Sequence, residues 1–223
     1  MSQFNVAAPD SLPARIAERV RRRMFDKFMR RFAPTRRDSV LDVGVTSDRT
    51  YAASNYFEAL YPFPAQITAA GTEDAAFLEQ LYPGLKFVRA DALDLPFPDG
   101  SFDLVHSSAV LEHVGAANNQ RRMIAECLRV ARRGVCITTP NRWFPIELHT
   151  QIPLIHWLPP PLARNILRRL GYGFFAEEKN LNLMSRSQLR VACSGINGWR
   201  FEIVPERVLG WTSNLMLFAG ATR

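Results

Sequence analysis

The segment VLDVGVTSDR, residues 40–49, has residue types suited to holding a cofactor. Residues 40–44 form an apolar run that predicts a buried strand, and the run closes with Asp42 and Gly44. A glycine at a strand end lets the backbone come close to a ligand, and many nucleotide-binding domains continue with a glycine-rich loop. Three polar side chains follow here instead: Thr46, Ser47 and Asp48. Either these side chains have replaced the glycines as contacts of a cofactor, or cofactor binding has been lost.

The four histidines are the side chains best suited to exchange protons near pH 7. His113, in the run LEHV, is the candidate catalytic base, with a structural bond to the backbone as the alternative. His149 and His156, in a segment rich in proline and aromatic residues, are the other candidate bases, while His106 lies in an apolar run and is expected in the core. No pair of possible ligands has the spacing of a metal motif, so no metal site is predicted.

The elements that must position these residues alternate between strands and helices. Apolar runs predict five strands, at residues 40–44, 67–70, 87–90, 102–107 and 135–139. The spacing of apolar residues predicts helices at 49–61, 75–82 and 123–131, the last of them capped by Gly134. This alternation predicts an α/β protein whose parallel sheet is covered by helices on both faces.

The pattern changes after the fifth predicted strand. Residues 141–184 are interpreted as an insertion that contains one short helix near residues 163–170. Ser185 and Gln188 then form a capping box, which predicts the start of a further helix. The chain closes with two β-like runs, 199–209 and 214–222. The short connection between these runs predicts a C-terminal antiparallel hairpin.

Two long stretches resemble the class I S-adenosylmethionine-dependent methyltransferases. FVRADALDLPFPDGSFDLVHSSAVLEHV, residues 87–114, is similar to the third and fourth strands of the small-molecule branch that includes quinone-biosynthesis enzymes. AECLRVARRGVCITTPN, residues 125–141, resembles the next helix and the fifth strand of the same family. The length of 223 residues, without a linker-like segment, predicts a single domain over residues 1–223, of which the resemblance covers residues 40–141 well and the final hairpin loosely. The resemblance implies a Rossmann-like doubly wound sheet of five parallel strands and a C-terminal antiparallel hairpin, with an inserted lid after the fifth strand.

The resemblance assigns residues at the strand ends to S-adenosylmethionine, the cofactor of the family. Asp42 and Gly44 would lie near the amino-acid tail of this cofactor. Asp91 matches the acid that accepts a hydrogen bond from the adenine amino group. The backbone amide of Ala92 would also contact the adenine, and Ser107 and Ser108 would lie beside the sulfonium.

The acid that usually binds the ribose is displaced in this sequence. The family tends to end its second strand with an acid that contacts both ribose hydroxyls, and that cofactor-binding position is Gly71 here. Glu73 or Asp74 would have to reach back instead. Both acids also suit the first turn of a helix, where they interact favourably with the helix dipole.

The implied reaction is methyl transfer to a small molecule, lipid or glycan, in which positioning supplies most of the acceleration. Four residues of the insertion are expected to bind this acceptor beneath a lid, or alternatively to form a satellite cluster: Trp143, His149, His156 and Trp157. A non-catalytic binding or scaffold protein on the same fold is the alternative, which the altered loop favours. A nicotinamide dehydrogenase is disfavoured, because no G-x-G-x-x-G follows the first strand.

Positive charge is concentrated near the N-terminus. The net charge is +7, and residues 15–37 carry 10 basic and 2 acidic side chains, a net of +8. Apolar residues recur at helical spacing in this basic arm, which predicts an amphipathic helix. The helix would either pack on the domain or contact an anionic membrane. Nucleic acid is not an expected partner, because no recognition motif accompanies the charge.

The remaining composition favours a cytoplasmic protein, with peripheral contact at the membrane face if the basic arm docks there. No apolar run reaches the about 18 residues that span a bilayer. The N-terminus lacks the features of a signal peptide. Three widely spaced cysteines are expected as buried free thiols: Cys127, Cys136 and Cys193. The sequence indicates no oligomeric state.

Overall fold

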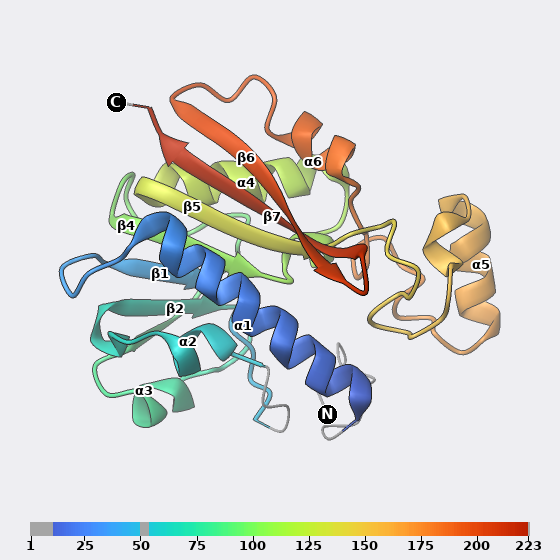
Figure 1. The fold of residues 1–223 in the computed structure, drawn as a ribbon, viewed down its shortest axis with the longest axis horizontal. Helices are drawn as coiled ribbons and strands as arrows, with labels where there is room; N and C mark the ends of the chain where they lie inside the picture. The colour runs from blue at the N-terminus through green and yellow to red at the C-terminus, as the bar shows by residue number, and fades with distance from the viewer. Residues whose placement is uncertain (1–10, 50–53, 223) are drawn as a thin grey trace.

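The computed structural model describes residues 11–49 and 54–222, and it confirms the predicted α/β fold (Figure 1). Within these ranges seven strands form one sheet in the order β3-β2-β1-β4-β5-β7-β6. Their bounds are Val40–Val43 (β1), Ile67–Gly71 (β2), Lys86–Arg89 (β3), Phe102–Ser108 (β4), Ala131–Pro140 (β5), Trp199–Val208 (β6) and Trp211–Ala221 (β7). Strands β1 to β5 pair in parallel, while β7 runs antiparallel to both β5 and β6.

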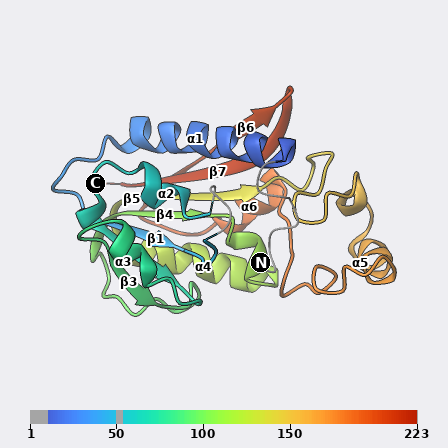
Figure 2. The ribbon, with the colours of Figure 1, turned by 90° about the horizontal axis from the view of Figure 1, so that it is seen from below.

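Helices cover both faces of this sheet (Figure 2). The helices are Leu12–Phe32 (α1), Tyr56–Leu60 (α2), Phe77–Leu81 (α3), Ala117–Val130 (α4), Pro160–Arg169 (α5) and Arg186–Ala192 (α6). Short 3-10 turns lie at Pro64–Gln66 (η1), Leu111–His113 (η2) and Ile155–Trp157 (η3). Apolar residues of α1, α2 and α3 pack on one face, and those of α4 and α6 pack on the other. None of the helices in the described part of the chain has both the length and the apolarity to cross a bilayer.

The basic arm of the sequence forms helix α1, most of whose apolar stripe is buried against the sheet. Ser11 begins the helix by accepting a hydrogen bond from the backbone of Ala14. On the sheet side Phe28 is fully buried. Lys27, on the adjoining flank of the helix, forms a 2.6 Å ion pair with the buried Glu206 of β6. Val20, Met24 and Phe28 of the stripe are buried, whereas Leu12 and Ile16 near the start of the helix are exposed. A contact with anionic membrane would therefore rely mainly on the charged face, and that contact stays a prediction.

Two predicted helices differ in the structure. Of the helix expected at 49–61, the described residues contain only α2, and residues 50–53 lie outside them. Asn55, directly before α2, has a left-handed φ of 51°. Gly134 is not a helix cap, because α4 ends at Val130 and β5 follows at once. A Cβ atom at Gly134 would lie 2.2 Å from the ring of Phe32. This glycine therefore leaves room for the end of α1 to cross the sheet.

The insertion begins and ends at one point of the fold. An isolated β-bridge joins Asn141, directly after β5, to Met184, two residues before α6. Between them η3 and α5 project beyond the edge of the sheet (Figure 1). This part has a small core of its own, made by Ile155, Ala163, Leu167 and Ala176.

Candidate functional site

The first loop leaves β1 at Gly44, whose φ of +101° is a conformation that glycine adopts easily. The backbone N–H groups of Gly44 and Val45 both donate to the carbonyl oxygen of Ala70, at 2.7 and 3.1 Å. A Cβ atom at position 44 would lie 2.0 Å from Cγ2 of Val110. Glycine is therefore required here both by the turn and by the approach of the segment that follows β4.

Polar side chains hold the rest of this loop in place. Asn55 accepts a bond from the backbone N–H of Thr46 and donates one to its carbonyl, each at 2.9 Å. Ser54 donates to the carboxylate of Asp48 at 3.1 Å. The backbone N–H of Ser47 donates to Glu73 at 3.1 Å, and the hydroxyl of Ser47 donates to the same oxygen. Residues 46–48 of the loop are thus held by hydrogen bonds with the side chains of Ser54, Asn55 and Glu73.

The structure distinguishes between the two acids that follow β2. A Cβ atom at Gly71 would lie 2.4 Å from the carbonyl oxygen of Val45, so no acidic side chain fits at that strand end. Glu73, two residues later, reaches the first loop. Asp74 instead accepts a 3.0 Å bond from the backbone of Ala76 and begins the turn before α3.

The other predicted cofactor residues lie along the same edge of the sheet. Asp91 is exposed after β3 and accepts a 2.9 Å bond from the backbone of Leu93. The hydroxyl of Ser108 bonds that of Thr138 at 2.9 Å across β4 and β5. Ser107 is fully buried and donates to the carbonyl of Val43 at 2.8 Å. The side chain of Ala92 is buried beneath this edge. Their roles toward a cofactor stay predictions.

Asp42 belongs to a buried cluster beneath the first loop. Its carboxylate lies 2.5 Å from Nδ1 of His106, and Nε2 of the same ring lies 3.3 Å from the hydroxyl of Tyr56. Burial raises the pKa of Asp42 to about 7 and lowers the pKa of His106 to about 3. Glu58 is also buried, and its pKa is raised well above the usual value by burial and by the charge of Asp42. His106 is the core histidine that the sequence predicts.

Glu58→Gln tests this cluster through the dependence of stability on pH. The pKa of Glu58 is raised in the folded state, so between the unfolded-state pKa and the folded one the unfolded chain releases this proton while the folded chain keeps it, and stability falls as pH rises. Glutamine carries no such proton. We expect the variant to gain about 1.4 kcal/mol per pH unit relative to the native chain across that window. Denaturant unfolding from pH 5 to 8 measures this gain, with the exposed Glu18→Gln as control. Parallel stability curves for Glu58→Gln and the native chain would contradict the buried, protonated acid.

Two histidines and two acids converge beyond the ends of β4 and β5. Glu112 and His113 lie in η2, and His113 donates through Nδ1 to the carbonyl of Asn180 at 2.6 Å. In the insertion, His149 is bonded through Nδ1 to the carboxylate of Glu147 at 2.7 Å. The centroids of the two imidazole rings are 4.9 Å apart. The predicted base and one predicted acceptor residue are therefore neighbours, although 35 residues separate them in the sequence.

The surroundings of these groups shift their pKa values in opposite directions. Burial lowers the pKa of His113, which favours the neutral imidazole. Burial also opposes the charged form of His149, but its hydrogen bond and charge interaction with Glu147 raise its pKa overall. Burial would raise the pKa of Glu147, yet hydrogen bonds from His149 and Thr150 bring it down to about 2.

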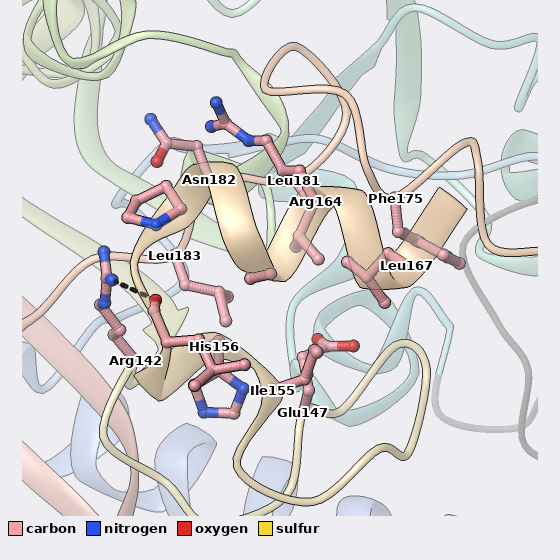
Figure 3. Close-up of a pocket in the computed structure, with 13 residues that line it drawn as sticks. Arg142, Glu147, Ile155, His156, Arg164, Leu167, Phe175, Leu181, Asn182 and Leu183 are labelled. Atoms are coloured by element: carbon pink, nitrogen blue, oxygen red, sulfur yellow. Dashed lines mark hydrogen bonds between the residues drawn. The ribbon is translucent and has the colours of Figure 1, made fainter. Parts of the chain in front are cut away.

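A cavity of about 60 Å³ lies within the insertion (Figure 3). His156 lines the cavity and is fixed by a 2.7 Å bond from Nε2 to the carbonyl of Phe144. Arg142 also lines the cavity and donates to the carbonyl of Leu158 at 3.4 Å. The part-exposed indoles of Trp143 and Trp157 pack on each other at 6.3 Å and do not line the cavity. Of the four predicted acceptor residues, only His156 lines it, and Glu147 connects it to His149.

Sequence reasoning missed three buried acids: Glu58, Glu112 and Glu147. The burial of Glu58 could have been predicted, because this acid lies among apolar residues of a short helix, between Phe57 and Leu60. Glu112 lies in the 3-10 turn η2, and Glu147 lies in a loop of the insertion. Only the fold shows that these two segments meet.

The structure can now be set beside known proteins. Residues 41–138 match a family model described as a methyltransferase domain. Ajmaline N-methyltransferase of Rauvolfia serpentina is 31% identical over 108 residues, which cover 48% of this chain and 34% of that protein. The probable chloroplastic tocopherol O-methyltransferase of Oryza sativa subsp. japonica is 36% identical over 102 residues, which cover 44% and 27%. The chain thus spans about a third or less of the length of these curated relatives.

Solved structures agree with this fold. Magnesium protoporphyrin IX methyltransferase from Synechocystis PCC 6803 with bound SAH superimposes with a TM-score of 0.57. The superposition covers 99% of this chain and 91% of that one at 14% identity, so it shows the fold alone. Residues 41–138 thus match a methyltransferase-domain family, and the chain has the fold of a solved methyltransferase.

Proposed function

We propose that the chain is an S-adenosylmethionine-dependent methyltransferase that acts on a small molecule, lipid or glycan. One observation carries the proposal: Glu73 reaches from the end of β2 to the first loop and is bonded there by Ser47. A carboxylate is thereby held at the loop although Gly71 has no side chain. The position of Glu73 supports the interpretation that the loop has been rebuilt and that Glu73 replaces the usual ribose-binding acid.

The residues that would hold the cofactor lie along the carboxyl edge of the strands, where ligands of such sheets bind. Glu73 would accept bonds from the ribose hydroxyls, and Asp91 with the Ala92 backbone would face the adenine. Gly44 and its loop would lie beside the amino-acid tail. Asp42 stays a predicted contact of that tail, although its carboxylate is bonded to His106. The cofactor would supply an activated methyl group.

The protein's part in such a transfer is to position the acceptor and, for a hydroxyl or protonated amine, to remove a proton. His113 is supported as the base, because burial keeps its imidazole in the neutral form that accepts a proton. The cavity beside His156 and the insertion around it support an acceptor site covered by a lid.

A non-catalytic binding or scaffold role on the same fold is favoured by one observation. The side chain of Val110 packs directly against Gly44, at the strand end where the resemblance places the cofactor tail. If Val110 keeps that place, the tail of S-adenosylmethionine has no access to the Gly44 backbone. Cofactor binding therefore distinguishes the two roles.

Asp91→Ala is expected to weaken binding of S-adenosylhomocysteine by about 1.5–3 kcal/mol, the scale of one hydrogen bond to a charged group. The fold should persist, because Asp91 is exposed at a strand end. Isothermal titration calorimetry measures the change, and the nearby exposed Asp94→Ala serves as control. Equal affinities for the native chain and a folded Asp91→Ala variant would remove this residue from the adenine site.

A further inference from the structure

Three buried or nearly buried side chains meet where the segment after β4 faces the insertion. They are Glu112, His113 and His149, and one potential ligand atom of each lies within 4.8 Å of the others. Oε1 of Glu112 is 3.9 Å from Nε2 of His113. Two ligands bonded to one ion at about 2.1 Å stand about 3.0–3.4 Å apart. Shifts of an ångström or so in the side chains would therefore bring all three to one ion.

Hydrogen bonds orient both imidazoles for this purpose. Nδ1 of His113 donates to the carbonyl of Asn180 at 2.6 Å. Nδ1 of His149 is bonded to the carboxylate of Glu147 at 2.7 Å. In a neutral imidazole whose Nδ1 carries the proton, Nε2 carries the lone pair. A bond from the far nitrogen to a carbonyl or a carboxylate is the usual support of a metal-binding histidine.

Glu112 provides an independent observation. Its side chain is fully buried, and Oε2 accepts a 2.9 Å bond from the hydroxyl of Thr139. Oε1 is also buried, and it accepts no hydrogen bond from residues 11–49 or 54–222. A carboxylate oxygen buried without a partner costs free energy unless an ion or a proton satisfies it. That oxygen is the one nearest His113.

We propose that Glu112, His113 and His149 bind a divalent first-row transition-metal ion of the zinc type. Two imidazoles and one carboxylate form a donor set that such ions prefer, whereas magnesium and calcium prefer oxygen ligands alone. Three protein ligands leave coordination positions for a further molecule. Sequence spacing did not indicate this site, because the third ligand comes from the insertion.

The neighbouring cavity suggests what that further molecule is. Glu147, Phe175 and Asn182 line the cavity, and each also contacts the three-residue cluster. Phe175 packs on the ring of His149 at 5.6 Å, and the backbone N–H of Asn182 donates to the carbonyl of Glu112 at 2.8 Å. In a use that rests on the proposed function, the ion would bind an oxygen of the methyl acceptor and lower its pKa, so that in the metal-loaded protein His113 would be a ligand and not the base.

Metal binding is tested without cofactor or turnover, so its outcome does not depend on the methyltransferase assignment. The chelator-treated full chain is titrated with Zn²⁺ by calorimetry, and we expect one ion per chain. His113→Gln and His149→Gln should each weaken Zn²⁺ binding at least 100-fold. His156→Gln is the matched control, because this histidine lies in the same insertion outside the cluster, and it should bind as the native chain does. Circular dichroism confirms that each variant is folded.

A second measurement covers variants that fail to fold. X-ray absorption of the Zn²⁺-loaded native chain should show two imidazole ligands and oxygen ligands. The proposal is overturned if the native chain binds no Zn²⁺, if both folded histidine variants bind as tightly as it does, or if the spectrum lacks imidazole. Displacement of Zn²⁺ by equimolar Mg²⁺ would also overturn the assigned class of ion.

Discussion

A chain from which α1 has been deleted is expected to lose its cooperative fold, and Phe28→Ala alone is expected to cost about 3–5 kcal/mol of unfolding free energy. Phe28 is fully buried. Its ring packs edge-on against Phe57 at 5.2 Å and against His106 at 5.6 Å. Deleting the helix would also leave Glu206 buried without Lys27, and an unpaired buried charge is strongly destabilising.

Denaturant unfolding of the full chain and of Phe28→Ala measures this effect. Leu12→Ala is the matched control, because Leu12 lies on the same helix and is 71% exposed. We expect it to change stability by less than about 0.5 kcal/mol. If the deleted chain unfolds cooperatively at the native midpoint, the basic arm is a separate docking element. In that case we expect the intact chain to bind anionic vesicles through α1, and we expect salt to weaken this binding.

Most of the fold was predictable, because the strands of a parallel sheet are buried on both faces. Such strands read as apolar runs whatever lies between them. Helix limits were less predictable where tertiary contacts decided them. Gly134 looks like a helix cap by its position, yet it is a strand residue that leaves room for Phe32. Nothing local in the sequence distinguishes these two uses of glycine.

The site was predictable only in part. The order of strands and helices predicts that the carboxyl ends of the parallel strands meet at one edge of the sheet. This was enough to place the first loop and the candidate residues after each strand together. The choice between Glu73 and Asp74 depends on side-chain direction, which sequence spacing does not contain. The cluster of Glu112, His113 and His149 depends on how the insertion folds back, and that packing is a long-range contact.

Glu73→Ala is expected to weaken binding of S-adenosylhomocysteine by about 3 kcal/mol or more, which exceeds 100-fold in Kd. The substitution removes the proposed contacts with both ribose hydroxyls. It also removes the acceptor that Ser47 bonds through its backbone and its hydroxyl, so the loop loses an anchor. Calorimetric titration measures the loss.

Asp74→Ala is the matched control for this variant. Asp74 follows Glu73 in the sequence and carries the same charge, but it bonds the backbone of Ala76 and not the loop. We expect its effect on affinity to stay below tenfold. If Glu73→Ala binds as tightly as Asp74→Ala, Glu73 orders the loop without contacting the ribose.

The central claim is that the loop of Thr46, Ser47 and Asp48 has been rebuilt to bind S-adenosylmethionine without the usual glycines. Calorimetric titration of the native chain with S-adenosylhomocysteine tests this claim most directly. We expect saturable binding at one site per chain. A folded chain that shows no binding of this ligand would contradict it and would leave the non-catalytic role, with Val110 covering Gly44, as the explanation of the altered loop.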